Sequence, residues 1–121
     1  MKIQFCSDLH LEFPENKALL TATPIKPVGD ILILAGDIVP FTAMEDHPDF
    51  FYSISDHFKQ SYLIPGNHEY YYSDAARYSG KLIEKIRDNI SLVNNQVIIL
   101  DGIRFIFTTL WSSISSAGAR L

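Results

Sequence analysis

The stretch Ile-Leu-Ile-Leu-Ala-Gly-Asp, residues 31–37, decides the fold expected of this 121-residue chain. An apolar run without polar alternation is typical of a strand in the middle of a sheet whose faces are covered by helices. The run stops at Gly36, and the carboxylate of Asp37 follows directly. These residues therefore predict a buried parallel strand with an acidic side chain at its carboxyl end.

Two other apolar runs end in the same way. Residues 3–6 (Ile-Gln-Phe-Cys) precede the polar residues Asp8 and His10, and residues 62–64 (Tyr-Leu-Ile) precede the Gly-Asn-His-Glu sequence at 66–69. Because parallel strands end at the same edge of a sheet, we expect the three polar clusters to meet there. Strands that alternate with helices predict an α/β fold with layered helices and sheet.

The rest of the chain shows weaker signals for individual elements. The apolar spacing in residues 49–59 predicts an amphipathic helix. Residues 14–29 are interrupted by prolines and predict a connection with one helical turn at 17–20. A second helix is predicted to begin at Ser73, because four apolar residues further on follow helical spacing: Leu82, Ile83, Ile86 and Ile90.

A β-hairpin is predicted near the end of the chain. Asp101-Gly102 lies between the apolar runs 97–100 and 103–107, and an Asp-Gly pair in this setting is a strong hairpin signal. We expect the second strand to continue through Trp111, after which residues 112–118 are mostly Ser, Ala and Gly.

Composition excludes several classes of protein. Hydrophobic residues make up 47% of the chain and charged residues 20%, which indicates a globular domain. The net charge of -4 does not indicate a nucleic-acid partner, and no apolar run is long enough to span a membrane. Cys6 is the single cysteine, so a disulfide within the chain and a thiolate zinc cluster are excluded. A reducing, cytoplasmic location fits this composition.

The polar clusters supply the donors of a metal site. Two carboxylates, Asp8 and Asp37, would repel each other unless a cation lies between them. Asp8 and His10 are two residues apart, so in an extended segment both side chains reach the same ion. Asp37 has two oxygens that can bridge two ions, and Asn67 adds a neutral oxygen. A two-metal centre of this kind clamps a phosphoryl group and activates water, and His68 could donate a proton to the leaving oxygen.

Each of these residues also has a structural alternative. Asp8 or Asp37 could serve only turn formation, His10 could be a half-buried core residue, and Asn67 could be a left-handed turn residue. Outside the clusters, His47 and His57 are expected to be solvated, since no carboxylate lies at ligand spacing from either. Two further assignments concern packing: Tyr70, Tyr71 and Tyr72 either line a pocket or pack on the helix that follows, and Cys6 is a small core residue.

The three motifs together resemble a known family. Residues 8–10 (Asp-Leu-His), 36–37 (Gly-Asp) and 66–69 (Gly-Asn-His-Glu), in this order and each after a predicted strand, are similar to the motifs of the calcineurin-like metallophosphoesterases. The resemblance covers residues 1 to about 111. It implies a layered α/β sandwich and the hydrolysis of phosphomonoesters or phosphodiesters by a metal-activated hydroxide.

The resemblance also implies a role for each site residue. Asp8 and His10 would bind the first divalent ion, Asp37 would bridge both ions, Asn67 would bind the second, and His68 would be the catalytic histidine. The implied metals are Mn, Fe, Zn, Ni or Mg, with Mn favoured, and the implied substrate is a phosphate ester.

The chain departs from the family pattern after residue 69. The family has a further metal-binding histidine and then a Gly-His-x-His pair, whereas no histidine follows His68 here. We therefore expect residues 1–121 to be the N-terminal part of a longer phosphoesterase domain, which pairs with its missing half or with a second copy. The alternative is a truncated or non-catalytic module that binds metal or phosphate.

Overall fold

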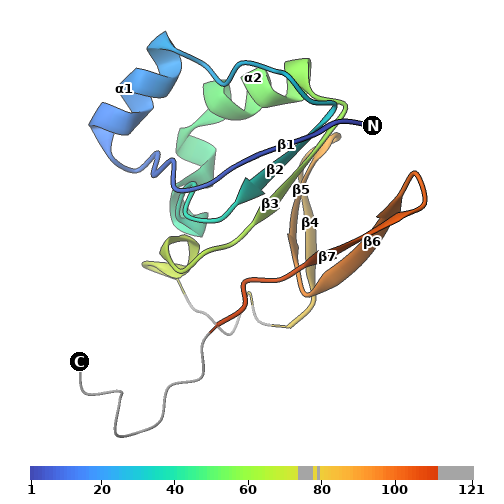
Figure 1. Ribbon diagram of the computed structural model, residues 1–121. Helices are drawn as coiled ribbons and strands as arrows, with labels where there is room; N and C mark the ends of the chain where they lie inside the picture. Colours follow the sequence, from blue (N-terminus) through green and yellow to red (C-terminus); the bar gives the residue numbers. More distant parts are fainter. Residues whose placement is uncertain (74–77, 79, 112–121) are drawn as a thin grey trace, which may run out of the picture.

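The computed structural model describes residues 1–73, 78 and 80–111, and its centre is a mixed sheet (Figure 1). The sheet has five strands in the order β1-β2-β3-β5-β4. Strands β1, β2, β3 and β5 are parallel, and β4 is antiparallel to β5. The bounds are β1 Ile3–Cys6, β2 Ile31–Ala35, β3 Gln60–Ile64, β4 Leu82–Arg87 and β5 Ile90–Asn94. The predicted α/β class and the first three strands are therefore confirmed.

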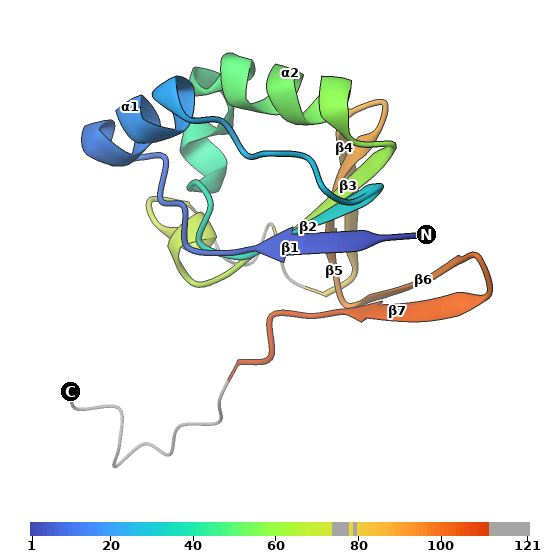
Figure 2. The ribbon, with the colours of Figure 1, turned by 45° about the horizontal axis from the view of Figure 1, so that its top comes forward.

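Two helices cover one face of the sheet, as Figure 2 shows. Helix α2, Pro48–His57, is the helix predicted at 49–59, and it buries Phe51 and Ile54. Helix α1, Pro14–Ala22, is longer than the predicted single turn. Pro14 is its first residue, where proline favours helix formation because the first N–H has no partner within the helix. The described residues also contain two short 3-10 turns, η1 Phe41–Asp46 and η2 His68–Tyr70.

The strand register separates two sets of apolar side chains. Leu32 and Leu34 of β2 and Leu63 of β3 are completely buried beneath the helices. Ile31 and Tyr62 point to the opposite face, where Phe107 packs beside them. Both faces of the parallel strands are thus apolar, which agrees with the uninterrupted hydrophobic run at 31–35.

The predicted hairpin packs on the face opposite the helices (Figure 2). It consists of β6 Gln96–Leu100 and β7 Ile103–Phe107, joined by Asp101 and Gly102, both with positive φ. The second strand ends at Phe107, so the predicted continuation to Trp111 is wrong. Thr109 instead donates its backbone N–H to the Asn94 side chain and its hydroxyl to the Pro65 carbonyl, which ends the ladder.

The helix predicted from Ser73 is wrong where the structure describes it. Residues 74–77 and 79 lie outside the described part, but Leu82–Arg87 and Ile90–Asn94 form the β4–β5 pair. The apolar residues that suggested a helix include β-branched isoleucines, which favour strands. Asn89 makes the turn between them, and its amide donates to the carbonyls of Ser55 and Phe58. Tertiary pairing of β5 with β3 therefore overrides the helical spacing.

Glu69 holds together the loops that follow β2 and β3. Its side chain is completely buried. Its carboxylate accepts four backbone N–H groups at 2.7–3.0 Å, from Asp37, Ile38 and Val39 in one loop and from Gly66 in the other. Burial raises the pKa of Glu69, and the four N–H donors act against that rise.

The two loops also come too close for any side chain at residue 66. A Cβ atom placed on Gly66 would overlap the Asp37 carboxylate and backbone. Glycine is therefore required here so that the loop after β3 can lie directly against the loop after β2.

Replacing Glu69 with Gln is expected to destabilise the fold by about 2–4 kcal/mol, because the amide cannot accept all four N–H groups and leaves buried donors unpaired. The measurement is the free energy of unfolding in urea. Glu45→Gln is the control, since Glu45 is exposed. A Glu69→Gln variant as stable as this control would show that the four hydrogen bonds do not hold the loops together.

The prediction that His47 is solvated is wrong, whereas His57 is exposed as predicted. His47 is only 7% exposed, and its Nδ1 has no hydrogen-bond partner within the described residues. His47 lines a cavity of about 390 Å³ between α1 and α2, and none of the predicted site residues lines this cavity. Burial, and then the charge of Lys17, lower the pKa of His47.

His47 should make the fold less stable in acid. A histidine whose pKa is lower in the folded state binds a proton more readily when unfolded, so stability is lost as pH falls below the unfolded value of about 6.5. His47→Gln should therefore lose less stability than wild type between about pH 8 and pH 5. Urea unfolding at both pH values measures this, with His57→Gln as the control. Equal losses of unfolding free energy in wild type and His47→Gln would show that His47 does not make the fold sensitive to acid.

No helix in the described ranges combines the length and apolar character needed to cross a membrane.

Candidate metal centre

The loops after β1, β2 and β3 meet at the carboxyl ends of the strands. Asp8 and His10 lie in the loop after β1, Asp37 in the loop after β2, and Asn67 and His68 in the loop after β3. Backbone hydrogen bonds join the first two loops, with the N–H of Asp8 donating to Gly36 and that of His10 to Asp37, both at 3.0 Å. The structure thus brings the five predicted site residues to one edge of the sheet.

Asp8, His10 and Asp37 form a group that could hold a metal ion. One ligand atom from each lies within 4.8 Å of the others. His10 Nε2 is 3.7 Å from Asp8 Oδ1, and the Asp8 side chain is 63% exposed, so an ion could reach it from solvent. Carboxylate oxygen with imidazole nitrogen is a donor set suited to divalent Mn, Fe or Zn. The donors present therefore fit the metal that the motifs imply.

The backbone of this group differs from the extended segment that we expected. Asp8, His10 and Asp37 all have left-handed backbone, with φ values of 59°, 47° and 55°. This conformation is uncommon for residues other than glycine, and it clusters at functional sites. Between Asp8 and His10, Leu9 packs against the core. The two side chains therefore approach each other through a twisted loop rather than through strand alternation.

Asn67 lies against the carboxylate of Asp37. With its amide nitrogen facing Asp37, Asn67 donates to both carboxylate oxygens at 3.2 Å. The backbone N–H of His68 donates to Asp37 Oδ1 at 2.9 Å. The alternative of a left-handed turn residue is wrong for Asn67, since its φ is −72°. The start of η2 therefore orients the residue predicted to bridge two ions.

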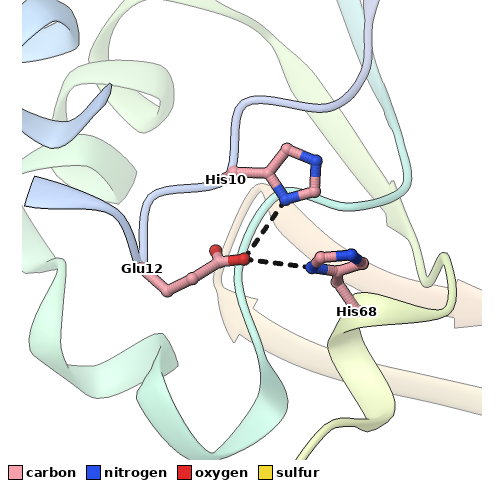
Figure 3. A group of neighbouring side chains, drawn as sticks. All are labelled: His10, Glu12 and His68. Atoms are coloured by element: carbon pink, nitrogen blue, oxygen red, sulfur yellow. Dashed lines mark hydrogen bonds and ion pairs between the residues drawn. The ribbon is translucent and has the colours of Figure 1, made fainter. Parts of the chain in front are cut away.

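His68 contacts a residue that our sequence reasoning missed (Figure 3). Glu12 Oε1 lies 3.2 Å from His68 Nδ1 and 3.2 Å from His10 Nδ1. The two imidazole rings are 4.5 Å apart. In residues 8–12 (Asp-Leu-His-Leu-Glu), the polar residues alternate with leucines. This alternation was the sequence signal that could have added Glu12 to the predicted site. His10, Glu12 and His68 form a second group of donors within 4.8 Å.

The three tyrosines after the histidine have different surroundings. Tyr70 packs edge-on against Phe41 at 5.1 Å, beside the core. Tyr71 stacks on the His68 ring at 4.4 Å, and Tyr72 is 91% exposed. The expected packing on a following helix is wrong where the structure describes that segment, because Leu82–Arg87 is a strand. Tyr70 packs on Phe41 of η1 instead, while Tyr71 covers one side of the histidine.

Cys6 agrees with its prediction as a small core residue. It is partly buried and packs against the main hydrophobic cluster. Burial raises the pKa of its thiol, which disfavours the reactive thiolate.

Comparison with known proteins agrees with this geometry. The family model of calcineurin-like phosphoesterase matches residues 1–115. A protein of Acanthamoeba polyphaga mimivirus, named "Uncharacterized protein L509", is 36% identical over 130 residues. The match covers 95% of this chain and 46% of the viral protein, so the chain spans about half the length of that relative. No solved structure matches the chain.

The family match extends over all three loops that carry the candidate ligands, and the sheet delivers these loops to a single edge. The chain belongs to the calcineurin-like phosphoesterase family.

Proposed function

We propose that this chain is the metal-binding part of a phosphoesterase that hydrolyses phosphomonoesters or phosphodiesters with two divalent ions. The observation that carries the proposal is the group formed by Asp8, His10 and Asp37, whose donor atoms lie within 4.8 Å of one another. In a member of this family, such a group beside His68 is best explained as one half of a dinuclear centre.

The candidate ligands divide between two ions. Asp8 and His10 would hold the first, Asp37 would contribute to both, and Asn67 would hold the second. When bound, such ions polarise the phosphoryl group and lower the pKa of water, which provides a nucleophile near neutral pH. Carboxylate oxygens combined with imidazole suit Mn, Fe or Zn, and Mn is the ion we propose among Mn, Fe, Zn, Ni and Mg.

His68 would deliver a proton to the leaving oxygen of the ester. Its Nδ1 faces Glu12 at 3.2 Å, so Nε2 is the ring atom left for substrate. Tyr71, stacked on the ring at 4.4 Å, restricts its rotation. A histidine held in one orientation is suited to general acid catalysis, which contributes about 10²–10⁴-fold to a rate.

A second candidate function is a non-catalytic module that binds metal or phosphate. Residues 1–121 carry the candidate ligands Asp8, His10, Asp37 and Asn67, whereas the resemblance implies three more histidine ligands, and this module would bind metal or phosphate with the ligands present. We place either form of the protein in the cytoplasm, because the one cysteine requires no oxidising compartment.

Two substitutions separate these candidates. With Mn and bis-p-nitrophenyl or p-nitrophenyl phosphate, Asp37→Asn should abolish hydrolysis and also weaken Mn binding, because a shared ligand is lost. His68→Ala should lower kcat by about 10²-fold or more, and it should leave Mn binding intact. The measurements are initial rates and isothermal titration calorimetry.

The control for both is His57→Ala, since His57 is exposed. Mn binding without hydrolysis in the wild-type chain would favour the non-catalytic module. Hydrolysis that neither substitution changes would contradict both residue roles.

The face of the sheet opposite the helices remains partly uncovered. Phe5 on β1 is 76% exposed, and Ile106 on the hairpin is 70% exposed. Within the described residues, β1 is an edge strand that pairs only with β2. Apolar surface of this kind marks an interface. We propose that further chain or a second copy covers it in the functional protein.

The isolated 121-residue chain should accordingly associate. Light scattering should give a mass above the 13.7 kDa of one chain, and Phe5→Lys should lower this mass by placing a charge in the apolar surface. Leu19→Lys is the matched control, because Leu19 is 64% exposed on α1, in the other layer. A monomeric wild-type chain would rule out a second copy as the cover of this surface.

A further inference from the structure

We propose that Glu12 is a positioning residue that orients His10 and His68 at the same time. One carboxylate oxygen would hold both imidazoles, the first as a metal ligand and the second as a proton donor. This inference rests on the proposed function for the meaning of the two histidines. The orientation of the two rings can be tested without catalysis.

The geometry assigns the same ring atom of each histidine to Glu12 (Figure 3). Glu12 Oε1 lies 3.2 Å from the Nδ1 atoms of both His10 and His68. A carboxylate is only an acceptor, so each Nδ1 must carry the hydrogen, and a neutral ring then has its lone pair on Nε2, as a metal ligand requires. To donate a proton from Nε2, His68 must be doubly protonated, and its Nδ1–H then still donates to Glu12. Nε2 of His10 faces Asp8 Oδ1 at 3.7 Å, on the side where the first ion would bind.

Glu12 is itself held in place. The preceding residue, Leu11, is buried in the core, and α1 begins two residues after Glu12. Asn16 of α1 donates to the carbonyls of Leu9 and His10 at 3.1 and 3.3 Å. The side chain of Glu12 is 20% exposed, so water weakens its hydrogen bonds less than on an open surface. These contacts fix the backbone that carries Glu12, and its carboxylate bonds through Oε1 alone, because Oε2 is buried without a hydrogen-bond partner among the described residues.

The two histidines have different supports apart from Glu12. His68 is also stacked on Tyr71 at 4.4 Å, whereas Phe13 lies 5.8 Å from the His10 ring in a tilted arrangement. Neither aromatic contact distinguishes Nδ1 from Nε2, because each contacts the ring rather than a nitrogen. Only Glu12, among the described residues, selects the tautomer of both rings.

A carboxylate that accepts from a metal-ligating histidine fixes the ring and raises its basicity, and loss of such a partner costs about 10–100-fold in metal affinity or activity. Here the same carboxylate would also serve the proton donor. Its loss should therefore affect the metal site and the proton transfer together, although Glu12 touches neither ion nor substrate.

The first test uses the metal-free chain with ¹⁵N-labelled histidine in mildly alkaline buffer. Long-range ¹H–¹⁵N NMR spectra report which ring nitrogen carries the hydrogen. His10 and His68 of wild type should both show the Nδ1–H tautomer. Glu12→Gln should produce a mixture of tautomers in both, and Glu12→Asp should restore Nδ1–H in part. Glu45→Gln, an exposed site, is the matched control.

The second test measures Mn binding by calorimetry. Glu12→Gln should lower the affinity for the more tightly bound ion about 10–100-fold and leave the number of bound ions unchanged. Loss of an ion from the stoichiometry would overturn the proposal, because it would make Glu12 a ligand in the group with His10 and His68. Unchanged tautomers and unchanged Mn affinity in Glu12→Gln would overturn it as well.

Kinetics separate the role of Glu12 at the proton donor His68 from its role at the metal ligand His10. If the wild-type chain hydrolyses phosphate esters, Glu12→Gln should lower kcat more for an alkyl than for an aryl phosphate, since an alkoxide needs the proton more. A wild-type chain without hydrolysis would contradict the proposed function alone. The NMR and Mn measurements would still decide the role of Glu12.

Discussion

The structure depends on the buried carboxylate of Glu69, which accepts four backbone N–H groups from two different loops. Strands β2 and β3 bring these loops to the same edge, but strand pairing does not determine how the loops lie beyond it. The carboxylate supplies that constraint, and the absence of a side chain at Gly66 permits the close contact. Asp37 and His68 therefore acquire a defined separation, joined by the hydrogen bond from the His68 N–H.

Three carboxylates in succession fix the site, beginning with Glu69. Glu69 fixes the backbone of the Asp37 loop, Asp37 accepts from the start of η2, and Glu12 reaches both histidines from a third loop. The carboxylates of the site differ in solvent exposure: Glu69 is buried, Asp37 and Glu12 are half-buried, and Asp8 is exposed. Exposure increases from the structural carboxylate to the candidate ligand that an ion must reach.

The sequence predicted the elements whose signal is local. The apolar run at 31–35 and the Asp101-Gly102 turn both depend on neighbouring residues, and both were confirmed. The β4–β5 pair was not predicted, because its apolar residues fit helical spacing and only pairing with β3 makes them strands. The meeting of the polar clusters followed from the parallel order of β1, β2 and β3.

The parts of the site that escaped prediction depend on contacts between distant residues or on backbone angles. Glu12 and His68 are 56 residues apart, and nothing in the sequence indicates that they touch. His47 was expected in solvent, because the residues of α1 and α2 that surround it come together only in the folded chain. The positive φ of Asp8 and His10 was not predicted, because glycine is the usual residue at such angles, although Asp and His adopt them more often than most other residues.

The left-handed backbone at three candidate ligands has an energetic consequence for the living cell. Each such residue costs about 1–3 kcal/mol relative to ordinary backbone. Under the proposed function, a cation that binds only the native state would stabilise that state and so offset this cost. The lifetime of the protein against unfolding and degradation would then follow the supply of manganese or a similar ion, and starvation for that ion would lower its abundance as well as its activity.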